Sequence, residues 1–389
     1  MLTKIRLKNF KSFKKETVID VVASKYTILN DTNIVDGICK GLLFVGGNAT
    51  GKTNTIASLA LLLDLLFANA YVNIPLLFCL NSRDKSMFLE YTFKFENDII
   101  IYYIEFERDG TIIKENLSLN NETMLNRLNL FAESFLTENK NYNENNIDKK
   151  TLFLKVIYFN TKFTNFPSLK KWFDFLSNSV YFNVQRASTF LDPAQSFNRS
   201  NSFNIYDYLE KNGVDEINKF LNSFNFKQSI TYGPLAPNAG VQLGLRKEIF
   251  LKRDYIDVKI PLLLESLGNQ TLLAMLPSLL HVIENDCMLL VDEFNSAFHN
   301  DLEELLVKFF MEKSKKSQMF FVSHSTNLLK TSLLRPDQVY TVDYNDNRGS
   351  RVNRISTFKP RESQNLEKMY LSGVFDGLPN YGDESDVKA

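Results

Sequence analysis

Apolar and polar positions alternate through much of the first third of the chain, which is typical of strands with one buried face. Residues 2–22 and 87–119 show this alternation, and the second stretch contains a hairpin turn with Arg-Asp-Gly at 108–110. Between them, residues 41–45 form a short apolar run, and apolar residues then recur at helical spacing over 54–66. The pattern predicts an antiparallel β lobe, a fully buried strand and a helix directly after that strand.

The pattern changes in residues 120–239, which are rich in Asn, Lys and Phe. This stretch contains helical runs such as Ser168–Val180, and a polar segment near 137–150 predicts a loose loop. We interpret 120–239 as an inserted, mostly helical lobe. Strand alternation returns over 241–260, and helices then alternate with apolar strands, as they do in an α/β core.

Composition narrows the range of partners. The chain has 389 residues, 44% of them apolar, so it can bury a large core. Lysine plus arginine and aspartate plus glutamate each total 45, and this neutral balance argues against a protein that coats nucleic acid with its whole surface. It leaves room for a local patch, and the candidate contacts for nucleic-acid phosphates are Lys8, Lys11, Lys14 and Lys15.

Cysteine usage and hydropathy predict a cytoplasmic protein. The three cysteines, Cys39, Cys79 and Cys287, lie far apart without the spacing of a metal site, which favours reduced structural thiols. No signal peptide is visible at the N-terminus, where strand residues begin at once. The longest apolar run, Leu59–Leu80, is interrupted by polar residues such as Asp64, so we expect a buried helix there and no membrane partner.

The apolar strand at 41–45 leads into a loop with the spacing of a phosphate-binding motif: two glycines separated by four residues, then lysine and threonine. Glycines let the backbone curl, so that successive N–H groups and the start of the next helix face a phosphate. Lys52 would contact the β- and γ-phosphates of ATP, and the Thr53 hydroxyl would hold Mg²⁺. The predicted nucleotide-binding residues of this loop are Gly46, Gly47, Asn48, Ala49, Thr50, Gly51, Lys52, Thr53 and Asn54.

A second apolar run, Cys287–Val291, ends in the carboxylates Asp292 and Glu293. A buried strand that delivers two carboxylates beside a phosphate loop suits phosphoryl chemistry. Asp292 would bind Mg²⁺ through a water molecule and, with Thr53, makes up the predicted metal site. Glu293 would polarise the attacking water, and we predict Glu293 and Lys52 as catalytic residues.

Three further motifs are arranged around the acidic strand. Ser266 and Gly268 open the helix before it, the sequence Asn295–His299 follows it, and a later apolar strand presents His324. The long separation of Thr53 and Asp292 excludes a small GTPase-like core unless a large lobe lies between them.

This order of motifs resembles the ABC-type ATPase fold. Within that fold the chain is similar to the OLD-like and RecF/SMC-like branch, specifically to stand-alone prokaryotic AAA-ATPase-domain proteins of the abortive-infection and phage-defence type. The resemblance covers residues 1–115 and 240–380, and the motifs that carry it are "LKNFKSF", "ESLG", "VDEFNSAFH" and "YLSGVFDGLPN". It implies an α/β ATPase head made of an N-terminal lobe (1–119) and a C-terminal lobe (240–389), with the helical lobe inserted between them.

The resemblance also assigns roles to the later motifs. Ser266 and Gly268 would form the signature that caps the γ-phosphate bound to a partner subunit, and a hydroxyl at a helix N-terminus is a chemically suitable anion site. The loop residues Asn295, Ser296 and His299 would cross the dimer interface. His324 would be the catalytic switch histidine beside the γ-phosphate. ATP would thus lie between two head-to-tail subunits, and its binding would close the dimer.

Other positions are left open by the sequence. Gln185 is one candidate for the glutamine that senses Mg²⁺, and Ser266 also fits a purely local helix cap. By similarity Lys11 would lie near the nucleotide, but a solvated lysine is the preferred interpretation. His281 lies on an apolar helix, where a structural role is expected.

The resemblance implies an ATPase sensor or motor subunit of a prokaryotic defence or DNA-transaction system. OLD-family nucleases carry a C-terminal Toprim nuclease domain, whereas only a short segment without a rich acidic cluster follows His324. We therefore expect a separate effector protein, a nuclease or a toxin. Two alternatives stay open: a nucleotide-binding subunit of an ABC transporter, and a scaffold that uses ATP only as a conformational switch.

Overall fold

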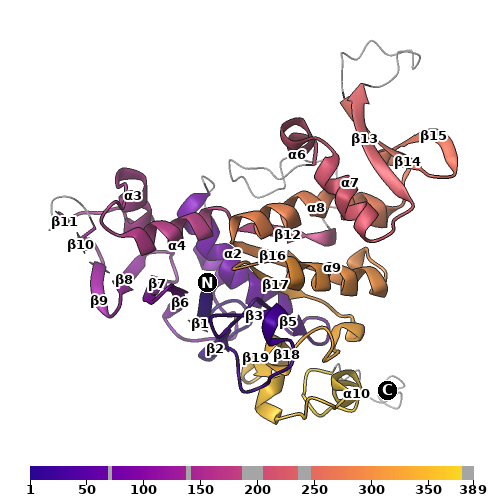
Figure 1. Ribbon diagram of the computed structural model, residues 1–389. Helices are drawn as coiled ribbons and strands as arrows, with labels where there is room; N and C mark the ends of the chain where they lie inside the picture. The colour runs from indigo at the N-terminus through magenta and orange to yellow at the C-terminus, as the bar shows by residue number, and fades with distance from the viewer. Residues whose placement is uncertain (69–71, 137–141, 186–204, 235–246, 379–389) are drawn as a thin grey trace, which may run out of the picture.

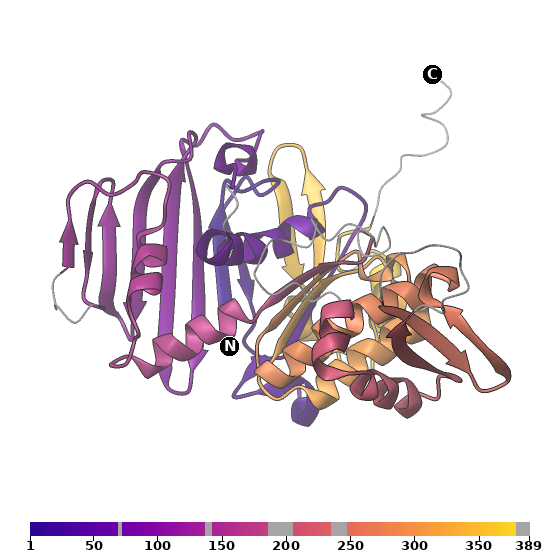
Figure 2. The same ribbon diagram turned by 90° about the horizontal axis from the view of Figure 1, so that it is seen from above.

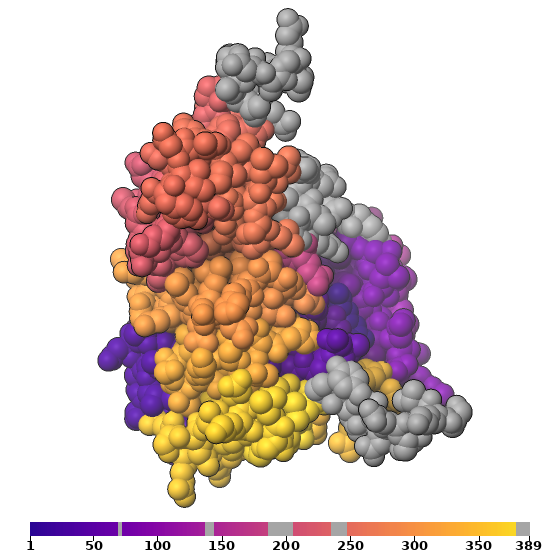
Figure 3. All heavy atoms as spheres, turned by 90° about the vertical axis from the view of Figure 1, so that its right-hand side faces the viewer, coloured from indigo at the N-terminus to yellow at the C-terminus, as the bar shows by residue number. Residues whose placement is uncertain are grey.

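A computed structural model describes residues 1–68, 72–136, 142–185, 205–234 and 247–378. An antiparallel sheet and a mostly parallel sheet lie side by side (Figures 1 and 2). A small third sheet lies at one end of the molecule, and the last described residues, up to 378 and coloured yellow, lie at the opposite end (Figures 1 and 3).

The mostly parallel sheet has the strand order β12-β16-β17-β5-β18-β19, in which only β19 is antiparallel to its neighbour. Every residue of β5, β16 and β17 is buried, as expected of parallel strands at the centre of an α/β core. Their carboxyl ends therefore meet at one edge. The strands are β5 (Gly41–Val45), β12 (Val180–Asn183), β16 (Met288–Asp292), β17 (Gln318–Val322), β18 (Val339–Asn345) and β19 (Gly349–Arg354).

Helices flank this sheet, and α2 follows β5 directly while α8 precedes β16. The residues of α2 include an almost continuous apolar run, because this helix is enclosed between the two large sheets (Figure 2). Its Ser58 carbonyl accepts a hydrogen bond from Tyr91 on the antiparallel sheet at 2.6 Å. The helices are α2 (Lys52–Phe67), α8 (Leu267–Asn285) and α9 (Asn300–Lys313).

The antiparallel sheet has the order β11-β10-β9-β8-β7-β6-β1-β2. Its inner side chains alternate with outward-facing ones, and the buried Trp172 of α4 packs its ring against Phe93 and Tyr102. The strands are β1 (Leu2–Lys8), β2 (Thr17–Asp20), β6 (Ser86–Phe95), β7 (Asp98–Glu107), β8 (Ile112–Leu119), β9 (Glu122–Leu128), β10 (Phe131–Ser134) and β11 (Tyr142–Glu144).

The antiparallel sheet extends beyond residue 119, at which the sequence places the start of a helical lobe. Three strands, β9 to β11, continue it to Glu144. Hydropathy does not reveal β9 because one of its buried positions is occupied by Arg127, which donates to the carbonyl oxygens of Asp148 and Thr151 and lies 3.8 Å from the buried Glu115 carboxylate. A charged residue at an inward position breaks the apolar pattern.

The rest of the predicted insertion is divided by β12, which joins the parallel sheet beside β16. Helices on either side of β12 fit the helical expectation, whereas β13, which lies within 120–239, does not. Its partners β14 and β15 lie in the stretch 241–260, where the sequence predicts strands. These elements are α3 (Phe153–Asn160), α4 (Pro167–Ser177), α6 (Ile205–Asn212), α7 (Asp215–Ser223), β13 (Gln228–Pro234), β14 (Lys247–Arg253) and β15 (Ile256–Pro261).

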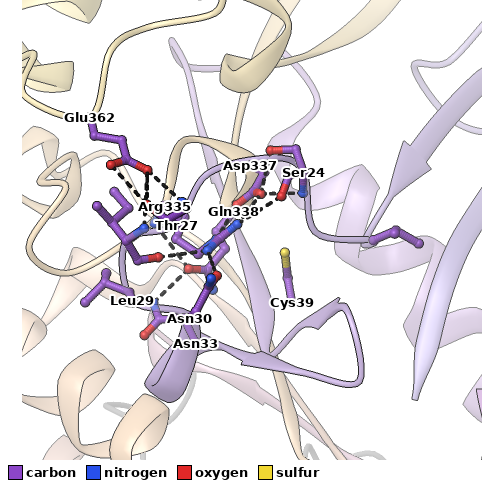
Figure 4. Close-up of polar contacts among 12 residues, drawn as sticks. Ser24, Thr27, Leu29, Asn30, Asn33, Cys39, Arg335, Asp337, Gln338 and Glu362 are labelled. Atoms are coloured by element: carbon purple, nitrogen blue, oxygen red, sulfur yellow. Dashed lines mark hydrogen bonds and ion pairs between the residues drawn. The ribbon is translucent and has the colours of Figure 1, made fainter.

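A buried polar network fastens the N-terminal segment to the start of β18 (Figure 4). Arg335 and Asp337 form a two-pronged ion pair, with both nitrogen-to-oxygen distances at 2.9 Å and both side chains fully buried. Asp337 also accepts hydrogen bonds from the backbone and hydroxyl of Ser24, and Arg335 donates to the Ile28 carbonyl. Breaking such a pair would leave a buried charge uncompensated, so it fixes where β18 lies beside β5.

The remaining short elements complete the chain. The three cysteines are free and buried, which agrees with structural thiols. Within the described residues, no helix has both the length and the apolar character needed to cross a bilayer. The short elements are α1 (Asn30–Asn33), β3 (Ile34–Val35), β4 (Ile38–Cys39), α10 (Leu366–Leu371) and 3-10 helices at Ile74–Leu77, Leu262–Leu264, Phe294–Ser296, Thr326–Leu328, Pro336–Gln338 and Ile355–Phe358.

Candidate nucleotide site

The glycine-rich loop connects the end of β5 to the start of α2, as the sequence predicts. Gly51 has φ 104°, and a Cβ there would collide with the hydroxyls of Ser12 and Ser350, so this position requires glycine. Ser350 donates to the Thr50 carbonyl at 2.5 Å, and Asn54 donates to Ser12 at 2.7 Å. Segments from both ends of the chain therefore hold the loop in shape.

Lys52 is 5% exposed, and its Nζ donates to the Gly47 carbonyl at 2.6 Å, within the loop itself. Burial lowers the pKa of Lys52 to about 8, although the charges of Glu293 and Asp292 act in the opposite direction. A partly desolvated ammonium group inside a loop of backbone amides is suited to an anionic ligand.

The loop and the carboxylate strand enclose a cavity of about 400 Å³. Its size is that of a small-ligand site. The cavity is lined by Asn48, Ala49, Gly51, Lys52, Thr53, Asn54, Glu293 and His324.

The predicted metal ligands lie in contact. The Thr53 hydroxyl donates to Asp292 Oδ1 at 3.0 Å, across 239 residues of sequence. The other carboxylate oxygen of Asp292 accepts from the Tyr181 hydroxyl and the Asn183 amide, each at 3.3 Å, because β12 runs parallel to β16 and pairs Asn183 with Asp292. A hydroxyl and a carboxylate beside a phosphate loop are the oxygen ligands that Mg²⁺ prefers, so these residues fit the metal.

Glu293 and His324 reach the cavity from the ends of neighbouring strands. Glu293 has φ 57°, a left-handed conformation that ends β16 sharply and turns the chain into the next loop. Burial and the charge of Lys52 lower the pKa of His324, while Glu293 and a hydrogen bond with the Gly46 backbone act to raise it. His324 is therefore held mainly neutral at pH 7, a state in which one ring nitrogen can accept a proton.

The signature residues begin α8, as expected. The Ser266 side chain accepts a hydrogen bond from the Asn269 backbone at 3.3 Å, so it does cap the helix locally. Ser266 is exposed, and neither it nor Gly268 is among the described residues that line the cavity. A Cβ on Gly268 would lie 3.0 Å from the Ala297 carbonyl, which places this helix end against the loop that follows Glu293.

That loop connects the carboxylates to the histidine. Asn295 Oδ1 accepts from the His324 backbone N–H at 3.0 Å, and Ser296 donates its N–H to the Glu293 carbonyl at 2.9 Å. His299 caps α9 and is exposed. Of the three residues that the resemblance assigns to an interface, Asn295 thus lies beside the cavity-lining His324, and His299 lies at the surface.

The structure also places the residues that the sequence leaves open. Gln185 lies two residues after Asn183, the last residue of β12, which pairs with Asp292. Lys11 is half-buried, with φ 49°. Burial lowers the pKa of Lys11, while the charge of Asp292 acts to raise it. His281 contacts the Asn178 carbonyl at 3.1 Å and does not line the cavity.

The sequence alone does not identify the residues that contact the glycine-rich loop and Asp292 from other parts of the chain. Asn183 and Ser350 belong to no motif, and Ser12 lies in "LKNFKSF" without an assigned role; their contacts in space bring them to the site. The motif "YLSGVFDGLPN" carries the resemblance, but the sequence assigns it no role. Its Gly377 carbonyl accepts the Gly47 N–H at 3.0 Å.

The family described as "AAA domain, putative AbiEii toxin, Type IV TA system" matches residues 42–330, which is more than half of the chain. The chain belongs to this AAA-domain family. The match runs from β5 to the segment after His324 and so includes the whole cavity lining. A comparison with curated proteins gives no match.

Solved structures show the fold of this AAA-domain protein to be that of an SMC head. The SMC head bound to the C-terminal winged-helix domain of ScpA has a TM-score of 0.50 and 15% identity, over 90% of this chain and 96% of that one. The SMC head domain from Thermotoga maritima has a TM-score of 0.49 and 17% identity, over 90% of this chain and 97% of that one. The predicted fold class, an α/β ABC-type ATPase head, is thereby confirmed.

Proposed function

We propose that this AAA-domain protein binds and hydrolyses ATP in the cavity between the glycine-rich loop and β16. The observation that supports this most directly is the Thr53–Asp292 hydrogen bond, with Lys52, Glu293 and His324 around the same cavity. No other arrangement on the described part of the chain combines an amide-lined anion site with an oxygen pair suited to Mg²⁺.

Each residue has a defined task in this proposal. The loop amides and Lys52 bind the β- and γ-phosphates, and Thr53 and Asp292 hold Mg²⁺, which neutralises phosphate charge when bound. Glu293 orients the attacking water and accepts its proton, since its carboxylate faces the cavity. Neutral His324 forms a hydrogen bond with the γ-phosphate. The hydrogen bonds from Tyr181 and Asn183 keep Asp292 in place.

We further propose that the site is completed by Ser266 and Gly268 of a second copy of the chain. The exposure of Ser266 at the start of α8, outside the cavity of its own chain, supports this arrangement. A head-to-tail dimer would contain two such shared sites.

Mixing two inactive variants tests the shared site. Lys52→Ala keeps an intact signature, and Ser266→Arg keeps an intact phosphate loop, so a mixed dimer has one complete site. We expect each variant alone to hydrolyse ATP at less than about 5% of the wild-type rate, and an equal mixture to recover roughly a quarter. Phosphate release measured over a titration of one variant with the other gives the result. A mixture no more active than its components would contradict the shared site.

The affinity for ATP should fall at alkaline pH because Lys52 loses its charge. With a pKa of about 8 in the free protein, Lys52 is mostly protonated at pH 7 and mostly neutral at pH 9. We expect the Kd for ATP to rise about tenfold between these values, measured by calorimetry with Mg²⁺ in excess. In Lys52→Arg the charge persists, so its profile should be flat, whatever its absolute affinity. A flat wild-type profile would show that Lys52 does not bind phosphate.

As to biological role, we propose a sensor or motor subunit that controls a separate effector, a nuclease or toxin, in a prokaryotic defence system. The family description, "putative AbiEii toxin, Type IV TA system", supports a place in such a system, and the separate effector is our proposal. Co-purification of the effector from its native host, dependent on ATP and lost in Lys52→Ala, is the expected result. A membrane permease in its place would favour the transporter alternative.

A further inference from the structure

The segment that carries His324 is held by side chains from α9 and from the loop before it. Asn295 accepts the His324 backbone N–H, and the Ser325 hydroxyl donates to Glu303 Oε1 at 3.0 Å. Ser325 also donates its N–H to the Ser323 hydroxyl at 3.0 Å. The backbone N–H groups of His324 and Ser325 are thus both hydrogen-bonded, and Glu303 of α9 accepts a hydrogen bond from the Ser325 side chain.

Glu303 is an unusual residue for its position. It is 1% exposed, on the face of α9 that also buries Leu306, Val307 and Phe310. Its second oxygen, Oε2, has no hydrogen-bond partner among the described residues. Burial raises the pKa of Glu303 to about 7; the hydrogen bond from Ser325 lowers it, and the charge of Glu304 adds to the increase.

If packing were the only requirement at position 303, an apolar side chain would stabilise the fold more than glutamate does. A buried carboxyl group with a single hydrogen-bond partner destabilises the fold. We infer from this cost that the hydrogen bond of Glu303 has a functional role. The neighbouring Glu304 makes a different set of contacts, to Asn327 and to the half-exposed Lys330. Within the described residues, the Glu303 side chain is hydrogen-bonded to Ser325, and Ser325 follows His324 in the sequence.

We propose that Glu303 is a positioning residue for His324, acting through the Ser325 hydroxyl. This inference rests on the proposed ATPase function of the cavity. His299 is the N-cap of α9 and Glu303 lies one turn later, so a displacement of this helix end would move Ser325 and with it the histidine. Asn295 provides the second contact, from the loop that starts at Glu293.

Steady-state hydrolysis separates positioning from binding. We expect Ser325→Ala and Glu303→Leu each to lower kcat about tenfold while the Kd for ATP stays within twofold, since neither side chain lines the cavity. The double variant should lose no more than either single one, because both remove the same hydrogen bond. Glu303→Gln keeps an acceptor for Ser325 and should retain at least a third of wild-type kcat. Glu312→Leu, an exposed carboxylate on the same helix, is the matched control and should be unchanged.

Wild-type kcat in Ser325→Ala, or a double variant whose loss is the product of the two single losses, would overturn the proposal. Ser325→Ala is a minimal truncation, so the test stands even where Glu303→Leu fails to fold.

Histidine NMR tests the positioning without any activity. The chain has three histidines, and with ¹³C-labelled rings the His324 signal is assigned by its disappearance in His324→Gln. We expect Ser325→Ala to shift the His324 signal and its titration midpoint and to leave His281 and His299 in place. An unshifted His324 signal would refute the inference. Absence of hydrolysis in the wild type would refute the proposed function alone, and the NMR result would still decide the role of Glu303.

Discussion

Lys52→Ala should weaken ATP binding by at least about 100-fold, the largest effect we expect from a single substitution. The Lys52 ammonium group is nearly enclosed, and without ATP it donates a hydrogen bond to the Gly47 carbonyl of the same loop. A phosphate would replace that carbonyl by charge-assisted hydrogen bonds, each worth roughly 1.5–3 kcal/mol. Truncation removes these bonds and leaves phosphate charge in a cavity that excludes part of the solvent.

Isothermal titration with ATP and Mg²⁺ measures the loss, and the thermal unfolding midpoint in the absence of nucleotide checks that the fold survives. Lys85→Ala is the matched control, because Lys85 is exposed just before β6 and far from the loop in sequence. Wild-type affinity in Lys52→Ala would show that ATP does not bind in this cavity.

Glu293→Gln should lower the hydrolysis rate by about 100-fold or more while ATP still binds. The amide has the size of the carboxylate, so the sharp turn at Glu293 and its carbonyl contact with Ser296 are preserved. It cannot accept the proton of the attacking water. The bound nucleotide then persists, and the shared-site proposal predicts that the variant accumulates as a dimer with ATP and Mg²⁺.

Light scattering coupled to gel filtration detects this dimer, and rapid quenching measures the residual hydrolysis. Glu284→Gln, on the exposed side of α8, controls for loss of a carboxylate as such. Hydrolysis at the wild-type rate would remove Glu293 as the base. An ATP-bound variant that remains monomeric would leave the base assignment intact and contradict the dimer.

The loop and the acidic strand are predictable because each is written in consecutive residues. Gly46 to Thr53 satisfies a local spacing rule, and Asp292 follows an uninterrupted apolar run. Their meeting at 3.0 Å follows from the rule that buried parallel strands share one carboxyl edge. The fold class follows in the same way from alternating helices and apolar strands.

Other parts of the site depend on pairing over long distances, which periodicity does not encode. One of the two neighbours of β16 is β12, a four-residue strand inside a stretch with helical character, and it places Asn183 beside Asp292. The antiparallel sheet similarly extends into β9 because Arg127 and Glu115 compensate each other's burial. Polar residues that are buried in pairs look like surface residues to a hydropathy pattern.

The contacts around the glycine-rich loop determine when, during synthesis, the chain becomes able to bind ATP. The Ser350 bond to Thr50 spans 300 residues, and the Gly377 carbonyl that receives the Gly47 N–H lies still later in the chain. Contacts of such separation form late, because the intervening chain must first be ordered. A ribosome-bound chain that has exposed the complete loop and α2 therefore still lacks part of the wall around the loop. ATP binding should appear only after the segment around Gly377 has emerged from the ribosome.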